Sequence, residues 1–129
     1  MSGKILLDTS FVIDVLRGIP AAHRVLSDGD DFYVPSITMG ELFSGAERSN
    51  RREARLAEAE AFADGAEVVP CDLETARRYG AIESALRARG RPIPDNDIWI
   101  AALAQQHELV VVTRDAHFDE VDALPVLSW

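Results

Sequence analysis

The sequence predicts an α/β fold, a three-layer α/β/α sandwich with a mostly parallel central sheet. Short apolar runs alternate along the chain with longer segments of helical periodicity, which is the order of β-α units. The short runs are apolar at consecutive positions, as expected of strands that helices cover on both faces of a parallel sheet. The chain has 129 residues, close to the usual size of one domain, so we expect a single domain over residues 1–129.

The first half of the chain contains two of the predicted strands. Thr9 or Ser10 can cap the first helix, which Gly18 ends. Pro20 opens the second helix, since proline is tolerated in a first turn. The expected elements are a strand at 4–8, a helix from 9 or 10 to 18, a helix from 20 to about 28–29, a strand at 32–35, a helix from 36 or 38, and a helix at 51–63 that forms a hairpin with it.

The second half contains the most apolar helix, whose hydrophobicity on all sides implies deep burial. Asp95 or Asn96 can cap this helix, and Asp72 can cap the long helix before it. The expected elements are a strand at 67–70, a helix from 72 to 89–90, the apolar helix at 98–106, a strand at 109–113 and an edge strand at 125–127.

The composition excludes several classes of protein. Hydrophobic residues make up 47% and charged residues 27% of the chain, the usual mixture of a folded globular protein. The longest apolar run, 98–104, is far shorter than the roughly 20 residues of a membrane span, and residues 1–8 lack a secretory hydrophobic region. Cys71 is the only cysteine, which excludes an intramolecular disulfide and a thiolate zinc cluster. We therefore expect a cytoplasmic protein without membrane contact, and a structural role for Cys71.

The net charge of −9 is unusual for a protein that binds nucleic acid. Twelve of the 13 basic residues are arginines, and several are grouped in sequence. The groups are Arg48, Arg51, Arg52 and Arg55, then Arg77 and Arg78, then Arg87, Arg89 and Arg91. Such groups favour solvated helix faces, with a phosphate track or a contact to an acidic partner as the alternative.

Four carboxylates lie near the carboxyl ends of the predicted strands, where open parallel sheets bind ligands. Asp8 closes the first strand, Glu41 follows the second, Asp97 lies in the first turn of the apolar helix, and Asp115 follows the Val-rich strand. Each also has an ordinary explanation, namely a helix cap, a capping box with Thr38, a contact with the helix dipole, and an Asx turn, respectively.

Convergence of these carboxylates would favour a metal site, because several negative charges in one cleft repel each other. Asp97 shares a helix face with Ile100 and Ala101, so it points towards the sheet. Oxygen-only ligation suits Mg²⁺ or Mn²⁺, and such an ion supports phosphodiester hydrolysis by an activated water. The sequence contains neither a Gly-x-Ser-x-Gly motif nor a phosphate-binding loop. His117 is interpreted as a surface residue or, alternatively, as a substrate contact.

Four segments together resemble PIN-domain proteins of the VapC toxin type, in order and spacing over nearly the whole chain. The segments are Leu-Leu-Asp-Thr-Ser at 6–10, Met-Gly-Glu-Leu-Phe-Ser-Gly-Ala at 39–46, Asp-Ile-Trp-Ile-Ala-Ala at 97–102 and Val-Thr-Arg-Asp-Ala-His-Phe at 112–118. The resemblance implies that the catalytic and metal-binding residues are Asp8, Glu41, Asp97 and Asp115. It implies supporting hydroxyls at Ser10 and Thr113, and leaves Asp95 as a helix cap or an outer contact.

The resemblance further implies a metal-dependent endoribonuclease that cleaves RNA as the toxin of a toxin–antitoxin pair. Its cofactor would be Mg²⁺ or Mn²⁺, and it would form a homodimer, with the helices that carry Phe43 and Phe62 as candidates for the dimer surface. Its partner would be a cognate VapB-type antitoxin whose tail, often through a basic residue, occupies the acidic cleft. Such a basic partner agrees with the net negative charge.

Three other classes of protein share some of these features. A receiver domain needs a phosphoacceptor Asp after the middle strand and a late lysine, whereas Val69 is followed by Pro70 and the only lysine is Lys4. A phosphatase of the haloacid dehalogenase type needs Asp-x-Asp after the first strand, where this chain has Asp-Thr-Ser. The remaining alternative is a non-catalytic interaction module whose acidic cleft binds only a partner protein.

Overall fold

The computed structural model describes residues 4–27 and 31–129 of the chain. In these residues a sheet of five strands has the order β3-β2-β1-β4-β5, and all neighbouring strands are parallel. The strands are β1 (Lys4–Leu7), β2 (Asp31–Pro35), β3 (Glu67–Val69), β4 (Val110–Val112) and β5 (Val126–Leu127). The predicted parallel sheet and its edge strand at the C-terminal end are thus confirmed.

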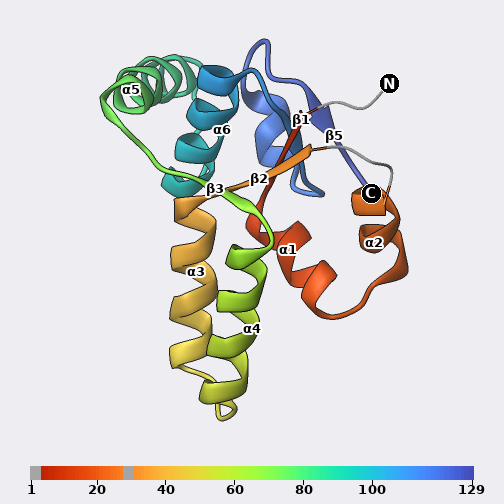
Figure 1. The fold of residues 1–129 in the computed structure, drawn as a ribbon. Helices are drawn as coiled ribbons and strands as arrows, with labels where there is room; N and C mark the ends of the chain where they lie inside the picture. Colours follow the sequence, from red (N-terminus) through yellow and green to blue (C-terminus); the bar gives the residue numbers. More distant parts are fainter. Residues whose placement is uncertain (1–3, 28–30) are drawn as a thin grey trace.

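The helices also follow the predicted order (Figure 1). They are α1 (Thr9–Leu16), α2 (Pro20–Ser27), α3 (Ser36–Glu47), α4 (Arg52–Asp64), α5 (Leu73–Ala88), α6 (Asp95–His107) and the short 3-10 helix η1 (Ala116–Glu120). The expected hairpin is formed by α3 and α4, which lie side by side and extend away from the sheet in Figure 1. The expected end of the second helix near 28–29 lies outside the described residues.

Two hydrophobic clusters cover opposite faces of the sheet. Leu6 and Val111 pack against α5 and α6, whereas Ile5, Leu7 and Val112 pack against the helices α1 to α4. Neighbouring residues of one strand point to opposite faces, so both faces of β1 must be apolar. This explains the uninterrupted apolar run that predicted the strand, and it confirms the three-layer architecture.

The helix caps differ from the prediction at α3 and α6, and at α1 the cap is one of the three predicted candidates. Asp8, and not Thr9 or Ser10, caps α1, because its side chain accepts a hydrogen bond from the Phe11 N–H at 2.9 Å. Helix α6 begins at Asp95 itself, directly after Pro94, so neither Asp95 nor Asn96 is its cap. The Pro94 carbonyl instead accepts the N–H groups of residues 97 and 98.

Helix α3 likewise begins directly after a proline, Pro35, and has no side-chain cap. Thr38 lies inside this helix and is fully buried, so the capping box of Thr38 and Glu41 does not form. The fixed φ of proline already suits a helix start. Helix α3 therefore begins at Ser36, the earlier of the two predicted positions, and α6 begins at Asp95, the first residue of its predicted cap pair. The Glu41 side chain is therefore free for another contact.

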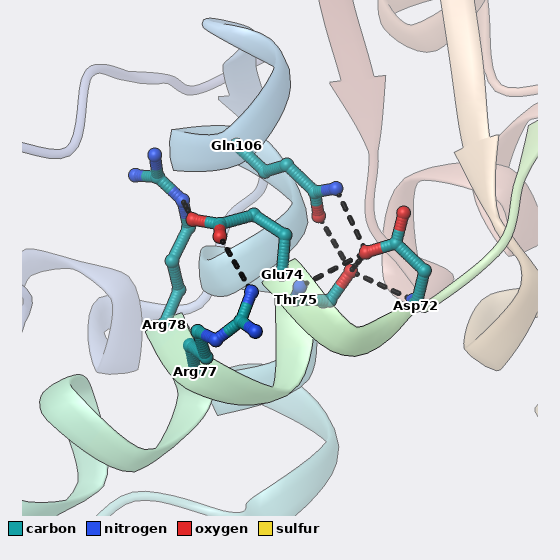
Figure 2. Close-up of polar contacts among 6 residues, drawn as sticks. All are labelled: Asp72, Glu74, Thr75, Arg77, Arg78 and Gln106. Carbon is teal, nitrogen blue, oxygen red and sulfur yellow. Dashed lines mark hydrogen bonds and ion pairs between the residues drawn. The ribbon is translucent and has the colours of Figure 1, made fainter.

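Asp72 caps α5 as predicted, and the same carboxylate joins the start of α5 to the end of α6 (Figure 2). It accepts hydrogen bonds from the Thr75 N–H at 3.1 Å and from Gln106 Nε2 at 2.9 Å. The Thr75 hydroxyl accepts the Asp72 N–H at 2.9 Å, which completes the capping box. Because Asp97 lies at the other end of α6, this contact helps to fix the helix that carries it.

Within the described residues, none of the helices combines the length and the apolar character that a membrane crossing requires. Cys71 is a free, partly buried thiol packed against the core beside α5 and α6. Burial raises the pKa of this thiol, which disfavours the reactive thiolate and agrees with the structural role predicted for it.

Candidate metal centre

Asp8 lies at the carboxyl end of the central strand β1, where it is 4% exposed. Leu7 pairs with Val112 of β4, so the residues that follow these two strands, Asp8 and Thr113, are also neighbours. Thr113 donates its hydroxyl to Asp8 Oδ2, and Ser10 donates to Asp8 Oδ1 at 2.9 Å. The predicted supporting hydroxyls are both present, and they hold the carboxylate that caps α1.

Asp97 and Asp115 converge on the imidazole of His117. The Nδ1 atom of His117 lies 3.0 Å from Asp97 Oδ2 and 2.9 Å from Asp115 Oδ1. One ligand atom from each of the three side chains lies within 4.8 Å of the other two. Asp97 comes from the first turn of α6, and the other two come from the segment after β4, so the fold joins residues that are 18 to 20 positions apart.

The segment after β4 is held by its own hydrogen bonds. The Asp115 N–H donates to Thr113 Oγ1 at 2.9 Å, and the His117 N–H donates to Asp115 Oδ1 at 3.0 Å. The second bond is the predicted Asx turn, and it turns residue 117 back towards the carboxylate. The Asx turn therefore positions the side chain of His117 and does not exclude a functional role for Asp115.

Burial raises the pKa of both Asp8 and Asp97, and the negative charge of Asp115 raises both further. The contact with His117 acts in the opposite direction on Asp97, and the hydroxyl of Thr113 does so on Asp8. Asp8 and Asp97 also repel each other. The three aspartates thus share one electrostatic environment that favours a cation.

Glu41 approaches the site from α3, on the side of Asp8. Its Oε1 accepts a hydrogen bond of 2.6 Å from the hydroxyl of Thr9, the residue after Asp8. Glu41 is exposed and lines a groove of about 290 Å³ between α1, α3 and α4. Among the described residues, the compact group of potential ligands is made of Asp97, Asp115 and His117, and neither Asp8 nor Glu41 belongs to it.

Asp95 is not part of this group of potential ligands. It accepts a hydrogen bond of 3.3 Å from the hydroxyl of Tyr79, and the Tyr79 ring stacks on Trp99 with centroids 4.3 Å apart. The predicted cap role of Asp95 is wrong because α6 begins at Asp95 itself, with Pro94 at the cap position. Its structural contact is with α5.

Three features of the site were missed in the sequence. The interpretation of His117 as a surface residue is incomplete, since its side chain is 44% exposed but contacts Asp97 and Asp115. The Asp-Ala-His spacing could have indicated this, because an Asx turn brings residue i+2 back towards residue i. Thr9 as the partner of Glu41 had no comparable local signal.

The third feature is the buried Asp14 of α1, which joins the site to the end of the chain. Arg114 donates to Asp14 Oδ2, and Trp129 Nε1 donates to the same oxygen at 3.0 Å. The Arg114 guanidinium also lies 4.7 Å from the centre of the Trp129 ring. Arg114 lies between Thr113 and Asp115 in the sequence. These contacts therefore help to hold the segment that carries Asp115 in place.

Seven of the nine grouped arginines pair with carboxylates, four of them on their own helix and three with a carboxylate of another segment. The exposed ion pairs are Arg52–Glu47, Arg55–Glu58, Arg77–Glu74, Arg78–Glu74, Arg87–Glu83, Arg89–Asp122 and Arg91–Glu120. Figure 2 shows Glu74 between Arg77 and Arg78. Such pairs agree with the prediction of solvated helix faces.

The sequence and the fold can now be compared with known proteins. The PIN domain family model matches residues 5–124. The chain is 33% identical over 129 residues to ribonuclease VapC2 of Haemophilus influenzae, with 98% of each chain covered. It is 33% identical over 130 residues to the tRNA(fMet)-specific endonuclease VapC of Shigella flexneri, again with 98% of each covered.

The fold is similar to that in the crystal structure of DNA-bound VapBC from Salmonella typhimurium. The TM-score is 0.90 at 31% identity, with 100% of this chain and 99% of that chain covered. The match thus extends over the whole sheet and all the helices that position the carboxylates. The chain therefore belongs to the PIN domain family and, within it, to the VapC proteins.

Proposed function

We propose that the chain is a metal-dependent endoribonuclease, a hydrolase of RNA phosphodiester bonds, that acts as the toxin of a toxin–antitoxin pair. The observation that carries this proposal is the convergence of Asp97 and Asp115 beside the buried Asp8 at the carboxyl ends of β1 and β4. The names of the relatives, ribonuclease and endonuclease, support it. VapBC proteins form toxin–antitoxin systems.

The donor set fits a divalent cation that prefers oxygen. Asp8, Glu41, Asp97 and Asp115 would hold Mg²⁺ or Mn²⁺, because the aspartates repel each other and a cation relieves that repulsion. The ion would lower the pKa of a bound water and neutralise charge on the phosphoryl group. Thr113 and Ser10 hold Asp8 in place, and Thr9 orients Glu41 towards the same edge.

The partners of the chain follow from the same proposal. We expect the substrate to be RNA. We also expect the protein to act in the cytoplasm, as one domain and as a homodimer. The inhibitor is a VapB-type antitoxin, and a basic residue in its tail would complement the carboxylates and the net charge of −9. Phe43 and Phe62 are partly buried against the core of α1 to α4, and the helices that carry them remain candidates for the dimer surface.

Expression in bacterial cells tests the enzyme and the toxin together. We expect wild-type chain to arrest growth and to fragment cellular RNA, as measured by culture density and by gel analysis of the extracted RNA. Asp8→Asn and Asp97→Asn should do neither. Asp95→Asn is the matched control, since Asp95 lies two residues from Asp97 but contacts Tyr79, and it should behave as wild type.

The same experiment separates the proposal from its main alternative. A non-catalytic interaction module would leave the RNA intact, and the Asp97→Asn variant would behave as wild type. Coexpression of the neighbouring small open reading frame should restore growth if it encodes the antitoxin. Normal growth and intact RNA with well-expressed wild-type chain would contradict the proposed function.

A further inference from the structure

The imidazole of His117 has an unusual position, since one nitrogen faces two carboxylate oxygens. Nδ1 lies 3.0 Å from Asp97 Oδ2 and 2.9 Å from Asp115 Oδ1. An N–H on this atom has one proton and points well at only one of the two oxygens. Without that proton, the nitrogen lone pair would face two anionic oxygens. A cation between the three atoms satisfies all of them at once.

The separations between these atoms suit a small octahedral ion. Ligands at about 2.1 Å from an ion and at right angles to each other are about 3.0 Å apart. The two distances from Nδ1 agree with this value, and the three ligand atoms all lie within 4.8 Å of one another. The three side chains therefore need little movement to become neighbouring ligands of one ion.

The local structure holds His117 in this position. Its N–H donates to Asp115 Oδ1 in the Asx turn, and the next residue, Phe118, is fully buried and anchors η1 in the core beside α6. The side chain of His117 remains 44% exposed. A metal-ligating histidine donates its second N–H to an acceptor such as water, which an exposed side chain can meet.

We infer that His117 is a nitrogen ligand of the metal ion, together with Asp97 and Asp115, and that it shifts the preference of the site from Mg²⁺ towards Mn²⁺. This inference rests on the proposed function, which places a divalent ion at these carboxylates. It adds a ligand that the four predicted carboxylates do not include.

The shift in preference follows from the chemistry of imidazole. Mg²⁺ is a hard ion that takes oxygen ligands and retains water. Sites that contain nitrogen gain affinity for first-row transition ions, of which Mn²⁺ is the weakest-binding member. Removal of the imidazole should therefore weaken Mn²⁺ binding more than Mg²⁺ binding.

Pulsed electron paramagnetic resonance of Mn²⁺ bound to the full chain tests this inference directly, because it detects nitrogen nuclei bonded to the ion. We expect a nitrogen signal in wild type and its loss in His117→Gln and His117→Ala. His107→Gln is the matched control, since His107 is exposed at the opposite end of α6 from Asp97, and it should retain the signal. Far-ultraviolet circular dichroism checks that each variant is folded.

Calorimetric titration provides the second measurement. We expect His117→Gln to weaken Mn²⁺ binding about tenfold, which is about 1.4 kcal/mol, and Mg²⁺ binding less than about threefold. Mn²⁺ binding to wild type without a nitrogen signal would overturn the inference and leave the proposed function intact, as would equal losses for both ions. A wild-type chain that binds neither ion would contradict the proposed metal centre itself.

Discussion

Asp8 has two roles that the sequence presented as alternatives. It caps α1 through the Phe11 N–H, and it lies at the strand edge beside Thr113. A carboxylate offers about four lone-pair sites, and Phe11, Ser10 and Thr113 supply three donors. One lone-pair site therefore remains for a cation or for a water bound to it. The role of Asp8 as a helix cap does not exclude a role in metal binding.

Thr9 provides a test of how Glu41 contributes. Thr9→Val keeps the shape of the side chain but removes the hydroxyl that donates to Glu41. We expect RNA cleavage to fall at least about tenfold, because a hydrogen bond to a charged group contributes about 1.5–3 kcal/mol and each step of about 1.4 kcal/mol is a factor of ten in rate. Thr9→Ser retains the hydroxyl and should cleave nearly as wild type. Equal kcat/KM values for the two variants would show that Glu41 does not depend on Thr9.

The pKa of Asp97 predicts how stability depends on pH when metal is removed. Burial raises this pKa above the ordinary 3.8, so between that value and the raised one the native state binds more protons than the unfolded state. The stabilisation from the protonated carboxyl is therefore complete below the ordinary pKa and is lost as the pH rises through the raised one.

Asp97→Asn lacks this titration and serves as the reference. With a chelator present, the unfolding free energy of wild type should decline relative to that of Asp97→Asn as the pH rises from the ordinary pKa of 3.8 through the raised one. Urea unfolding at several pH values measures the difference. A wild type that gains stability over the variant with rising pH would contradict the raised pKa.

At the scale of elements, Trp129 connects the end of the chain to α1 and to the segment after β4. Its ring packs edge-on against Phe11 with centroids 4.8 Å apart, and its N–H donates to Asp14. Asp14 also accepts from Arg114. The last residue of the sequence thus stabilises the segment that carries Asp115, although it lies outside the described helices and strands.

Two substitutions of Trp129 separate its packing from its hydrogen bond. Trp129→Phe retains much of the ring contact with Phe11 but loses the N–H donor, and we expect a loss of about 1 kcal/mol in unfolding free energy. Trp129→Ala also removes the packing and should cost about 2–3 kcal/mol, below the value for a fully buried tryptophan. Urea unfolding measures both. Equal stability of Trp129→Ala and wild type would show that the C-terminal contacts contribute nothing.

At the scale of the whole molecule, the order of the strands and helices followed from the sequence because burial on both faces of the sheet leaves uninterrupted apolar runs. The start of α6 did not, because Pro94 fixes the backbone before Asp95 and Asn96, the residues expected as caps. Helix α3 begins at Ser36, one of the two expected positions, but directly after Pro35 and without the expected capping box. Local propensities of Ser, Thr and Asp cannot reveal this competition.

The candidate site could be predicted in part for a related reason. Asp8 follows β1 and Asp115 follows β4. These two strands pair with each other, so the topology alone brings the two residues close. The contact of His117 with Asp97 spans 20 positions, and that of Thr9 with Glu41 spans 32. Both depend on how α6 and α3 are set against the sheet, which no sequence pattern specifies.

Removal and return of metal in a cleavage assay tests the central claim most directly. Purified wild-type chain should cleave total RNA with Mn²⁺ or Mg²⁺, lose this activity in excess chelator, and regain it when the ion is returned. Asp97→Asn should lose at least about a hundredfold, corresponding to about 2.7 kcal/mol, while Asp95→Asn cleaves as wild type. Cleavage that persists in chelator, or that Asp97→Asn supports as well as wild type, would contradict a metal-dependent ribonuclease centred on these carboxylates.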